Sequence, residues 1–170
     1  MKAVVVFESL YGNTRAIADA VAEGLGEKTE VEVVEVADVT PPVVESADLL
    51  VVGGPTHIHG MSSDRSRKGA VDDARRKSQP EPDVHGPALR TWFGDLGETS
   101  GARAAAFDTR LDKPKVFTGS AAKGIAHRLV SHGYEVVGEE SFLVEGTDGP
   151  LQEGELDRAR AWGRQLADGS

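Results

Sequence analysis

The sequence predicts an α/β fold in which helices cover both faces of a doubly wound, five-stranded parallel sheet, giving three layers. Short apolar runs alternate with segments of helical periodicity along the chain, the pattern of strands joined by crossover helices. Three of the runs, at residues 3–7, 49–52 and 102–107, are apolar apart from Arg103. Strands of this kind are buried on both faces of a sheet.

The length of the chain indicates one domain. A chain of 170 residues can bury a single hydrophobic core but has no room for a second independent one. Its hydrophobic fraction of 39% and charged fraction of 28% are those of ordinary globular proteins. We therefore predict a single domain over residues 1–170.

The first third of the chain gives a central strand, a helix and an edge strand. The strand at residues 3–7 precedes a helix whose apolar residues Ile17, Val21 and Leu25 recur every four positions. Valines then alternate with glutamates over residues 30–36, which predicts a half-exposed strand at the sheet edge.

The middle of the chain combines a buried strand with a highly charged segment. The strand at residues 49–52 ends in Gly53-Gly54-Pro55, which discourages both pairing and helix formation. Residues 62–79 are dense in charge and predict either an exposed helix or a mobile loop. A helix follows, and the spacing of its apolar residues predicts that Trp92 and Phe93 belong to the core.

The last third predicts two more strands and two more helices. After the strand at residues 102–107, Ser120 can cap a helix that ends near Gly133. We expect the last strand at residues 134–137, with an interrupted continuation at 142–144. The apolar face of the final helix is formed by Leu156, Ala159, Trp162, Gly163 and Leu166.

Charge and composition restrict the possible functions. The net charge of −9 argues against nucleic acid as a partner, because phosphate binding needs clustered lysine and arginine. The charge either keeps the protein soluble or attracts a basic protein partner. The absence of cysteine excludes disulfides and cysteine-ligated metals, so that redox chemistry would require a borrowed cofactor. No apolar run approaches the roughly 20 residues that span a bilayer, and we expect a cytoplasmic protein with no membrane partner.

Polar residues follow three of the buried strands, at residues 9–14, 55–60 and 108–110. Doubly wound sheets bind ligands beyond the carboxyl ends of their strands, at the point where the strand order reverses. We therefore expect these three segments to meet at one ligand site.

The first of these segments has the chemistry of a phosphate site. Residues 9–14 join a buried strand to a helix N-terminus, where free N–H groups and the hydroxyls of Ser9 and Thr14 can hold a phosphate monoester. The segment has neither the lysine of a nucleoside-triphosphate loop nor the three spaced glycines of a dinucleotide fingerprint. Taken alone, Gly12-Asn13-Thr14 favours a simple turn and helix cap over a phosphate site.

The full string Val5-Val6-Phe7-Glu8-Ser9-Leu10-Tyr11-Gly12-Asn13-Thr14, followed by Ala18 and Val21, resembles the phosphate loop of flavodoxins. The resemblance implies the flavodoxin strand order 2-1-3-4-5 and flavin mononucleotide (FMN) as cofactor. Tyr11 departs from the pattern, since flavodoxins usually have a small hydroxyl residue there; its N–H can still donate, and its side chain can cover the site. The implied phosphate-loop residues are Ser9, Tyr11, Gly12, Asn13 and Thr14.

The second segment is similar to the loop that flanks the isoalloxazine ring in the wider flavodoxin-like family. Its Pro-Thr start, followed by glycine and methionine, is closer to the flavin-dependent quinone reductases than to short electron carriers. We expect one of its two histidines to contact the flavin. A metal site at the two histidines would need a third ligand, and the sequence offers none at a helpful spacing. The implied cofactor residues are Pro55, Thr56, His57, Ile58, His59 and Gly60.

The third segment, Asp108-Thr109-Arg110, takes the place of the second flavin-flanking loop. Low-potential flavodoxins usually press an aromatic ring on the flavin, and neither loop offers one beyond Phe107. A cation at Arg110 would stabilise reduced flavin, so we expect a higher midpoint potential than in such carriers. Alternatively, Arg110 pairs with Asp108 or Asp112.

Three functions remain open at this stage. The first is an FMN-binding electron carrier between a reductase and an acceptor protein, with no catalytic residue of its own. The second is an FMN-dependent NAD(P)H:quinone oxidoreductase, in which a basic patch meets the nucleotide, unless that patch is only a solvated helix face. The third is a flavin-free module that binds another protein. The basic patch comprises Arg65, Arg67, Lys68, Arg75, Arg76 and Lys77.

Overall fold

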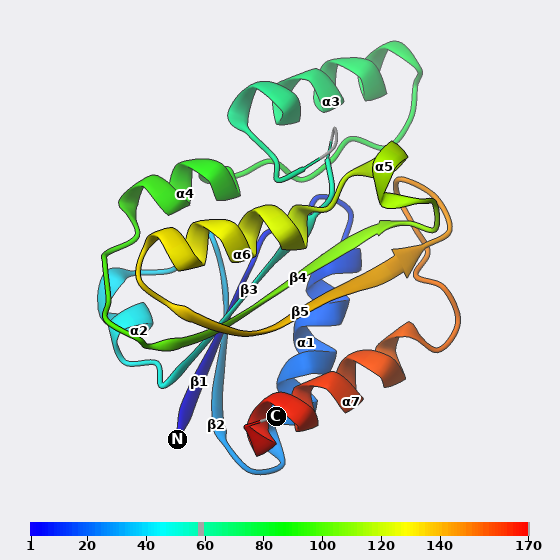
Figure 1. Cartoon of the computed structure of the whole chain (residues 1–170). Coiled ribbons are helices and arrows are strands. Elements are labelled where there is room, and N and C mark those ends of the chain that lie inside the picture. Colours follow the sequence, from blue (N-terminus) through cyan, green and yellow to red (C-terminus); the bar gives the residue numbers. More distant parts are fainter. Residues whose placement is uncertain (58–59, 170) are drawn as a thin grey trace.

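The computed structural model describes residues 1–57 and 60–169 and shows a parallel five-stranded sheet between layers of helices (Figure 1). The strand order β2-β1-β3-β4-β5 confirms the predicted fold class and topology. The strands are β1 (Lys2–Phe7), β2 (Glu30–Glu35), β3 (Leu49–Pro55), β4 (Arg103–Leu111) and β5 (Glu135–Val144). The helices are α1 (Asn13–Gly26), α2 (Pro41–Glu45), α3 (Asp64–Arg76), α4 (Leu89–Asp95), α5 (Lys115–Thr118), α6 (Ala121–Ser131) and α7 (Glu155–Asp168).

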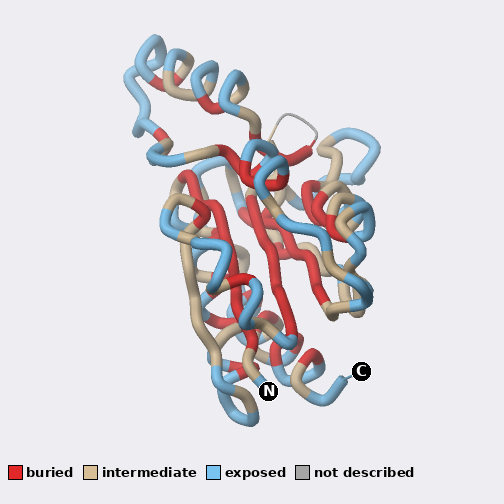
Figure 2. Tube along the Cα trace, turned by 90° about the vertical axis from the view of Figure 1, so that its left-hand side faces the viewer, coloured by how far each residue is buried: buried red, intermediate tan, exposed pale blue. Residues whose placement is uncertain are grey.

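The sheet separates two hydrophobic cores. Because side chains alternate along a strand, Val5 and Phe7 of β1 join the core under α1 and α7, whereas Val4 and Val6 join the core under α4 and α6. The central strands are buried along their length (Figure 2). Trp92 and Phe93 lie in the second core, as the helical spacing predicts.

Two glycines allow α1 and α7 to pack closely. A Cβ atom at Gly24 would lie 2.1 Å from the carbonyl oxygen of Arg160, and one at Gly163 would lie 2.2 Å from the carbonyl oxygen of Val21. Both distances are far below van der Waals contact, so any side chain at either position would push the helices apart.

The two edge strands differ in how well the sequence predicts them. The alternating valines and glutamates form β2 at one edge, as expected. At the other edge β5 is one continuous strand, so the predicted interruption is wrong. Its polar residues are tolerated at an edge, and the register shift opposite Ala104 and Ala105 absorbs one residue in a bulge. A Cβ at Gly138 would lie 3.0 Å from Leu166 Cδ2, so a side chain there would require Leu166 to shift.

The charged segment forms α3, so that the helical alternative is correct. Ser63 and Ser66 form a reciprocal capping box at its N-terminus. The helix lies beyond the carboxyl ends of the strands and is largely exposed (Figures 1 and 2).

Among the helices in residues 1–57 and 60–169, none combines the length and the apolar character needed to cross a bilayer.

Candidate functional site

The three polar segments meet at the carboxyl edge of the sheet, as predicted. Pro55 is paired with Thr109 in the β3–β4 register, and the N–H of Thr56 donates to the carbonyl oxygen of Thr109 at 2.8 Å. The hydroxyls of Thr14 and Thr109 lie 2.8 Å apart and are buried. Thr14 therefore joins the N-terminus of α1 to the end of β4.

The N-terminus of α1 is open to an anion. Gly12 precedes the helix with φ of 90°, a left-handed conformation that glycine adopts without strain. Its N–H donates to Ser9 Oγ at 3.0 Å. The N–H groups of Asn13, Thr14 and Arg15 have no acceptor among the described residues, and no side chain caps the helix. Three free donors and the positive helix end suit a phosphate group.

Two adjoining cavities lie at this edge. The smaller, of about 80 Å³, is a polar pocket with the volume of a small group rather than of a whole nucleotide. The larger, of about 760 Å³, separates α3 from the loop at residues 147–148. Tyr11 and Thr147 line both cavities, which are therefore neighbours. The small pocket is lined by Leu10, Tyr11, Asn13, Thr14, Pro55, Thr56, Thr109, Arg110, Leu111, Val144 and Thr147.

Tyr11 lies at the junction of the two cavities. Its hydroxyl pKa is raised above the ordinary value, first by burial and then by the negative charges of Asp148 and Asp73. The phenol therefore stays protonated and can donate a hydrogen bond into either cavity.

His57 is tied to the charged helix. Its Nε2 lies 2.9 Å from the carbonyl oxygen of Ser66 in α3, while its backbone pairs with Gly60. The ring also lines the larger cavity. The predicted cofactor residues Ile58 and His59 lie outside the described residues.

The side chain of Asp108 forms its hydrogen bonds with other residues of the protein. Its buried carboxylate accepts hydrogen bonds from the hydroxyls of Thr56 and Ser120 and from the N–H of Ala122, at 2.9–3.0 Å. One carboxylate thus fixes the exit of β3 and the N-terminus of α6. Ser120 caps α6, as the sequence predicts.

Arg110 lines the small pocket but forms neither predicted ion pair. Its Nη1 donates to the carbonyl oxygens of Leu111 and Lys113, at 3.2 and 2.8 Å. Asp108 is occupied by α6, and Asp112 accepts a hydrogen bond from Gln152. The Nε of Arg110 is buried with no partner in the described part of the chain, which leaves a donor at the pocket wall.

Sequence reasoning missed an aromatic residue in the connection after β4. Val116 and Phe117, in the short helix α5, expose 81% and 68% of their surfaces. The predicted segment at residues 108–110 has no aromatic side chain, but the apolar pair between Lys115 and Thr118 follows it closely in the sequence. Phe117 is thus a further aromatic side chain beyond the predicted flanking segment.

A buried ion pair holds α3 beside the site. Glu8 and Arg67 are each 4% exposed, and Arg67 Nη1 lies 3.4 Å from Glu8 Oε2. Burial raises the pKa of Glu8, while the hydrogen bond from Ser62 and the charge of Arg67 oppose the rise. Arg67 also donates to the carbonyl oxygens of His85 and Gly86.

The predicted basic patch is therefore smaller than the sequence suggests. Arg67 is buried, because Glu8 and two carbonyl oxygens satisfy its charge inside the protein. Arg75 pairs with Glu81, and Asp73 pairs with both Arg76 and Lys77. Three of the five remaining cations of the patch thus have an acidic partner, whereas Arg65 and Lys68 form no ion pair within the described residues.

Comparison with known proteins supports the same family. The flavodoxin family model matches residues 5–162. A search of curated proteins found no match. Among solved structures, the chain is similar to oxidised flavodoxin 2 from Bacillus cereus, with a TM-score of 0.68 and 19% identity over 100% of both chains. It is similar to the flavodoxin of Streptococcus pneumoniae TIGR4, with a TM-score of 0.67 and 21% identity over 100% of both chains.

A flavodoxin from the domain Archaea has a TM-score of 0.66 and 22% identity, over 99% of this chain and 98% of that one. These likenesses show the fold, and the family model adds the sequence pattern over nearly the whole chain. The chain belongs to the flavodoxin family, a family of flavin-binding proteins.

Proposed function

We propose that this protein binds FMN and carries electrons in the cytoplasm between a reductase and an acceptor protein. The observation that carries the proposal is the N-terminus of α1. It presents three unpaired N–H groups and the Thr14 hydroxyl at the carboxyl edge of the sheet, where the strand order reverses.

The residues present fit the chemistry of FMN. The N–H groups of Asn13, Thr14 and Arg15, with the hydroxyl of Ser9, would hold the phosphate without a lysine. The segments 55–60 and 110–118 would flank the ring, and bound FMN would supply reversible electron uptake. Asp108 acts indirectly by holding Thr56 in place.

Arg110 and Phe117 have opposite expected effects on the flavin potential. The positive charge of Arg110 at the pocket favours reduced flavin and raises the midpoint potential. An aromatic contact from the exposed Phe117 would disfavour reduced flavin and lower the midpoint potential, as the resemblance to low-potential flavodoxins implies. Potentiometric titration of Arg110→Gln and Phe117→Ala separates the two: we expect the first to lower the potential and the second to raise it.

Flavin binding is tested first. The purified chain is mixed with FMN, excess flavin is removed by gel filtration, and the visible spectrum is recorded. We expect retained flavin bands. Thr14→Val removes a hydroxyl that would meet the phosphate and should weaken FMN binding about 10- to 100-fold, since a hydrogen bond to a charged group contributes about 1.5–3 kcal/mol.

Thr29→Val is the matched control. The Thr29 hydroxyl is also buried, but it lies just before β2, away from the carboxyl edge of the sheet. We expect it to leave FMN affinity unchanged. A colourless protein, or equal losses in both variants, would contradict the proposed cofactor site and favour the flavin-free binding module.

One observation favours a second candidate function, an FMN-dependent NAD(P)H:quinone oxidoreductase. Arg76 and Lys77 line the larger cavity together with Tyr11 and His57, so a second substrate has room beside the proposed cofactor site. Arg76 and Lys77 both form ion pairs with Asp73, and this weakens their attraction for a nucleotide phosphate. This is why the carrier ranks first.

Steady-state kinetics distinguishes the two functions. An electron carrier with a net charge of −9 should exchange electrons with a basic redox protein at rates that fall as ionic strength rises. An oxidoreductase should consume NAD(P)H when only a quinone is added. Rapid NAD(P)H oxidation with quinone would replace the carrier proposal with the enzyme.

A further inference from the structure

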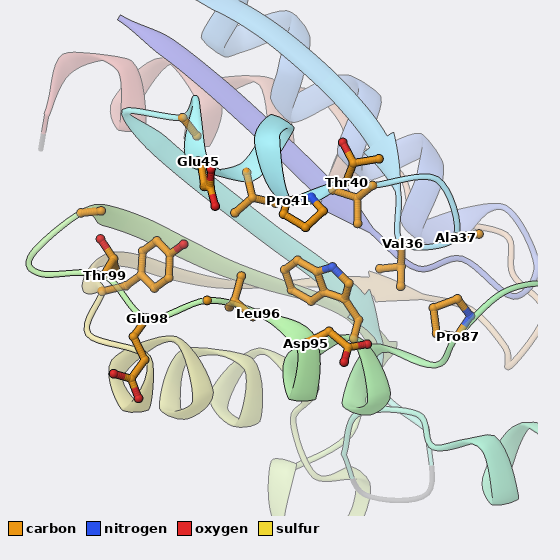
Figure 3. Close-up of a pocket in the computed structure, with 17 residues that line it drawn as sticks. Val36, Ala37, Thr40, Pro41, Glu45, Pro87, Asp95, Leu96, Glu98 and Thr99 are labelled. Carbon is orange, nitrogen blue, oxygen red and sulfur yellow. The ribbon is translucent and has the colours of Figure 1, made fainter.

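A groove between α2 and α4 lies away from the proposed flavin site (Figure 3). It lies where two of the helices on this face are short: α2 has 5 residues and α4 has 7, whereas α1 and α7 on the opposite face have 14 each. The groove has a volume of about 440 Å³, within the range of small-molecule sites. It shares no lining residue with the two cavities at the carboxyl edge of the sheet.

Most residues that line the groove are apolar, and two of them are aromatic. Val36 and Val44 are buried beneath it, and Trp92 and Tyr134 contribute aromatic rings to its lining. A ligand with a ring of its own could replace water on these side chains and gain apolar contact.

The charged residues of the groove are all acidic. Glu45, Asp95 and Glu98 line it, and no lysine, arginine or histidine of the described residues does so. Figure 3 shows Glu45 on the α2 side and the other two carboxylates on the opposite side. Within residues 1–57 and 60–169, none of the three forms an ion pair or a side-chain hydrogen bond.

Some acidic side chains of the protein are neutralised by neighbours, as Asp73 is by Arg76 and Lys77, whereas Glu45, Asp95 and Glu98 are exposed and have no ion-pair partner among the described residues. The groove therefore keeps an uncompensated negative field. Tyr134 lines the groove, and the pKa of its hydroxyl is raised first by burial and then by the charge of Glu45.

We propose that this groove is a second binding site and that it takes a small organic cation, a ring that bears a primary ammonium group. The ring would lie on the apolar and aromatic lining, and the ammonium would meet carboxylates that have no other partner. A neutral ligand would gain only the apolar contact, and an anion would be repelled. The volume matches a small molecule rather than a protein surface, whose interfaces need roughly 800 Å² from each partner.

Titration calorimetry on the full chain, with and without FMN, tests the charge preference. Three probes share a phenyl ring: 2-phenylethylammonium, the neutral 2-phenylethanol and the anionic 3-phenylpropanoate. We expect the cation to bind at least about tenfold more tightly than the alcohol, the anion not to bind, and the preference to shrink with salt. Equal affinity for cation and alcohol, or no binding of the cation, would overturn the proposal.

Two pairs of matched variants test the location. Gly97 lines the groove and Gly94 does not, and a Cβ at either position meets no atom within 4 Å. Gly97→Trp should weaken binding of the cation about tenfold or more, whereas Gly94→Trp should leave it unchanged. Circular dichroism and thermal unfolding of both variants verify that they fold.

The second pair compares two sets of three neutralised carboxylates. Neutralising Glu45, Asp95 and Glu98 with Gln, Asn and Gln should abolish the cation preference. Changing Glu30, Glu139 and Glu153 to Gln removes the same charge from exposed acids outside the groove and should preserve it. Equal losses in the two sets would mean that binding follows net charge alone, which would overturn the proposal. A lysine-rich peptide is tested in parallel. If the peptide binds and the small cation does not, the groove takes a protein, and the proposal is also overturned.

Discussion

Glu8 and Arg67 show how single side chains secure the region of the proposed site. Neither charge reaches solvent, so each relies on the other and on polar neighbours from three parts of the chain. Burying two charges costs free energy that their attraction only partly repays, while removing one of them leaves the other unpaired. The pair is therefore more sensitive to a single change than to a double one.

We predict that Glu8→Gln lowers the free energy of unfolding by about 3 kcal/mol, because it leaves the buried Arg67 without its counter-charge. The double variant Glu8→Leu, Arg67→Met should recover most of the loss. Urea unfolding of the wild type, Glu8→Gln, Glu8→Leu, Arg67→Met and the double variant checks both expectations, the last three with the wild type forming a closed cycle. Additive losses would show that the two residues do not interact energetically.

Glu155 gives the protein a pH-dependent contact between β5 and α7. Burial alone would raise the pKa of this carboxyl, but the hydrogen bonds from Arg158 and from the N–H of Leu143 outweigh burial and lower it. Because the folded pKa lies below the ordinary value of 4.5, the stabilisation is complete above that pH. It is lost as the pH falls through the folded pKa.

We therefore predict that Glu155→Gln reduces stability near neutral pH and flattens the acid side of the stability profile. Urea unfolding measured between about pH 3 and pH 6 checks this. Glu153→Gln, an exposed neighbour, should leave the profile as in the wild type. If the stability of the Glu155 variant falls with decreasing pH as that of the wild type does, this carboxyl does not contribute to the pH dependence.

At the scale of elements, long helices pack closely over one face of the sheet, whereas short helices leave a groove on the other face. The long helices α1 and α7 cover one face of the sheet and meet through Gly24 and Gly163. On the other face, α2 and α4 are too short to close over the sheet, and the acidic groove remains between them.

We predict that Gly24→Ala destabilises the protein by about 2–3 kcal/mol, because its Cβ would collide with the backbone of Arg160. Gly26→Ala is the control in the same helix, since its Cβ meets no atom within 4 Å. It should be neutral or stabilise the protein by up to about 1 kcal/mol through helix propensity. Equal effects in thermal unfolding would mean that α1 and α7 do not meet at Gly24.

For the whole molecule, ligand binding and folding are coupled. A ligand that binds only the folded chain raises the free energy of unfolding by about 2.7 kcal/mol at a hundred times its dissociation constant. The proposed phosphate site predicts that FMN raises the melting temperature more than riboflavin, which has the same ring and no phosphate, at equal concentration. Equal shifts would contradict a phosphate site at α1.

The sequence by itself determined the fold class, the strand order through its family resemblance, and the convergence of three polar segments at one edge. These features follow from local patterns: continuous apolar runs, helical spacing, and glycine with hydroxyl residues at a strand exit. Trp92 and the cap at Ser120 could be predicted for the same reason, since each depends on its neighbours in the chain.

Only the tertiary structure decided which charges are buried, which donors remain free and where the sheet stays uncovered. Arg67 belongs to no solvent-exposed patch because Glu8 and two carbonyl oxygens, all distant in sequence, surround it. The partners of Arg110, the continuity of β5 and the groove beside α2 likewise depend on elements that meet only after folding. Burial and pairing are properties of the assembled chain, and a local pattern of residue types does not contain them.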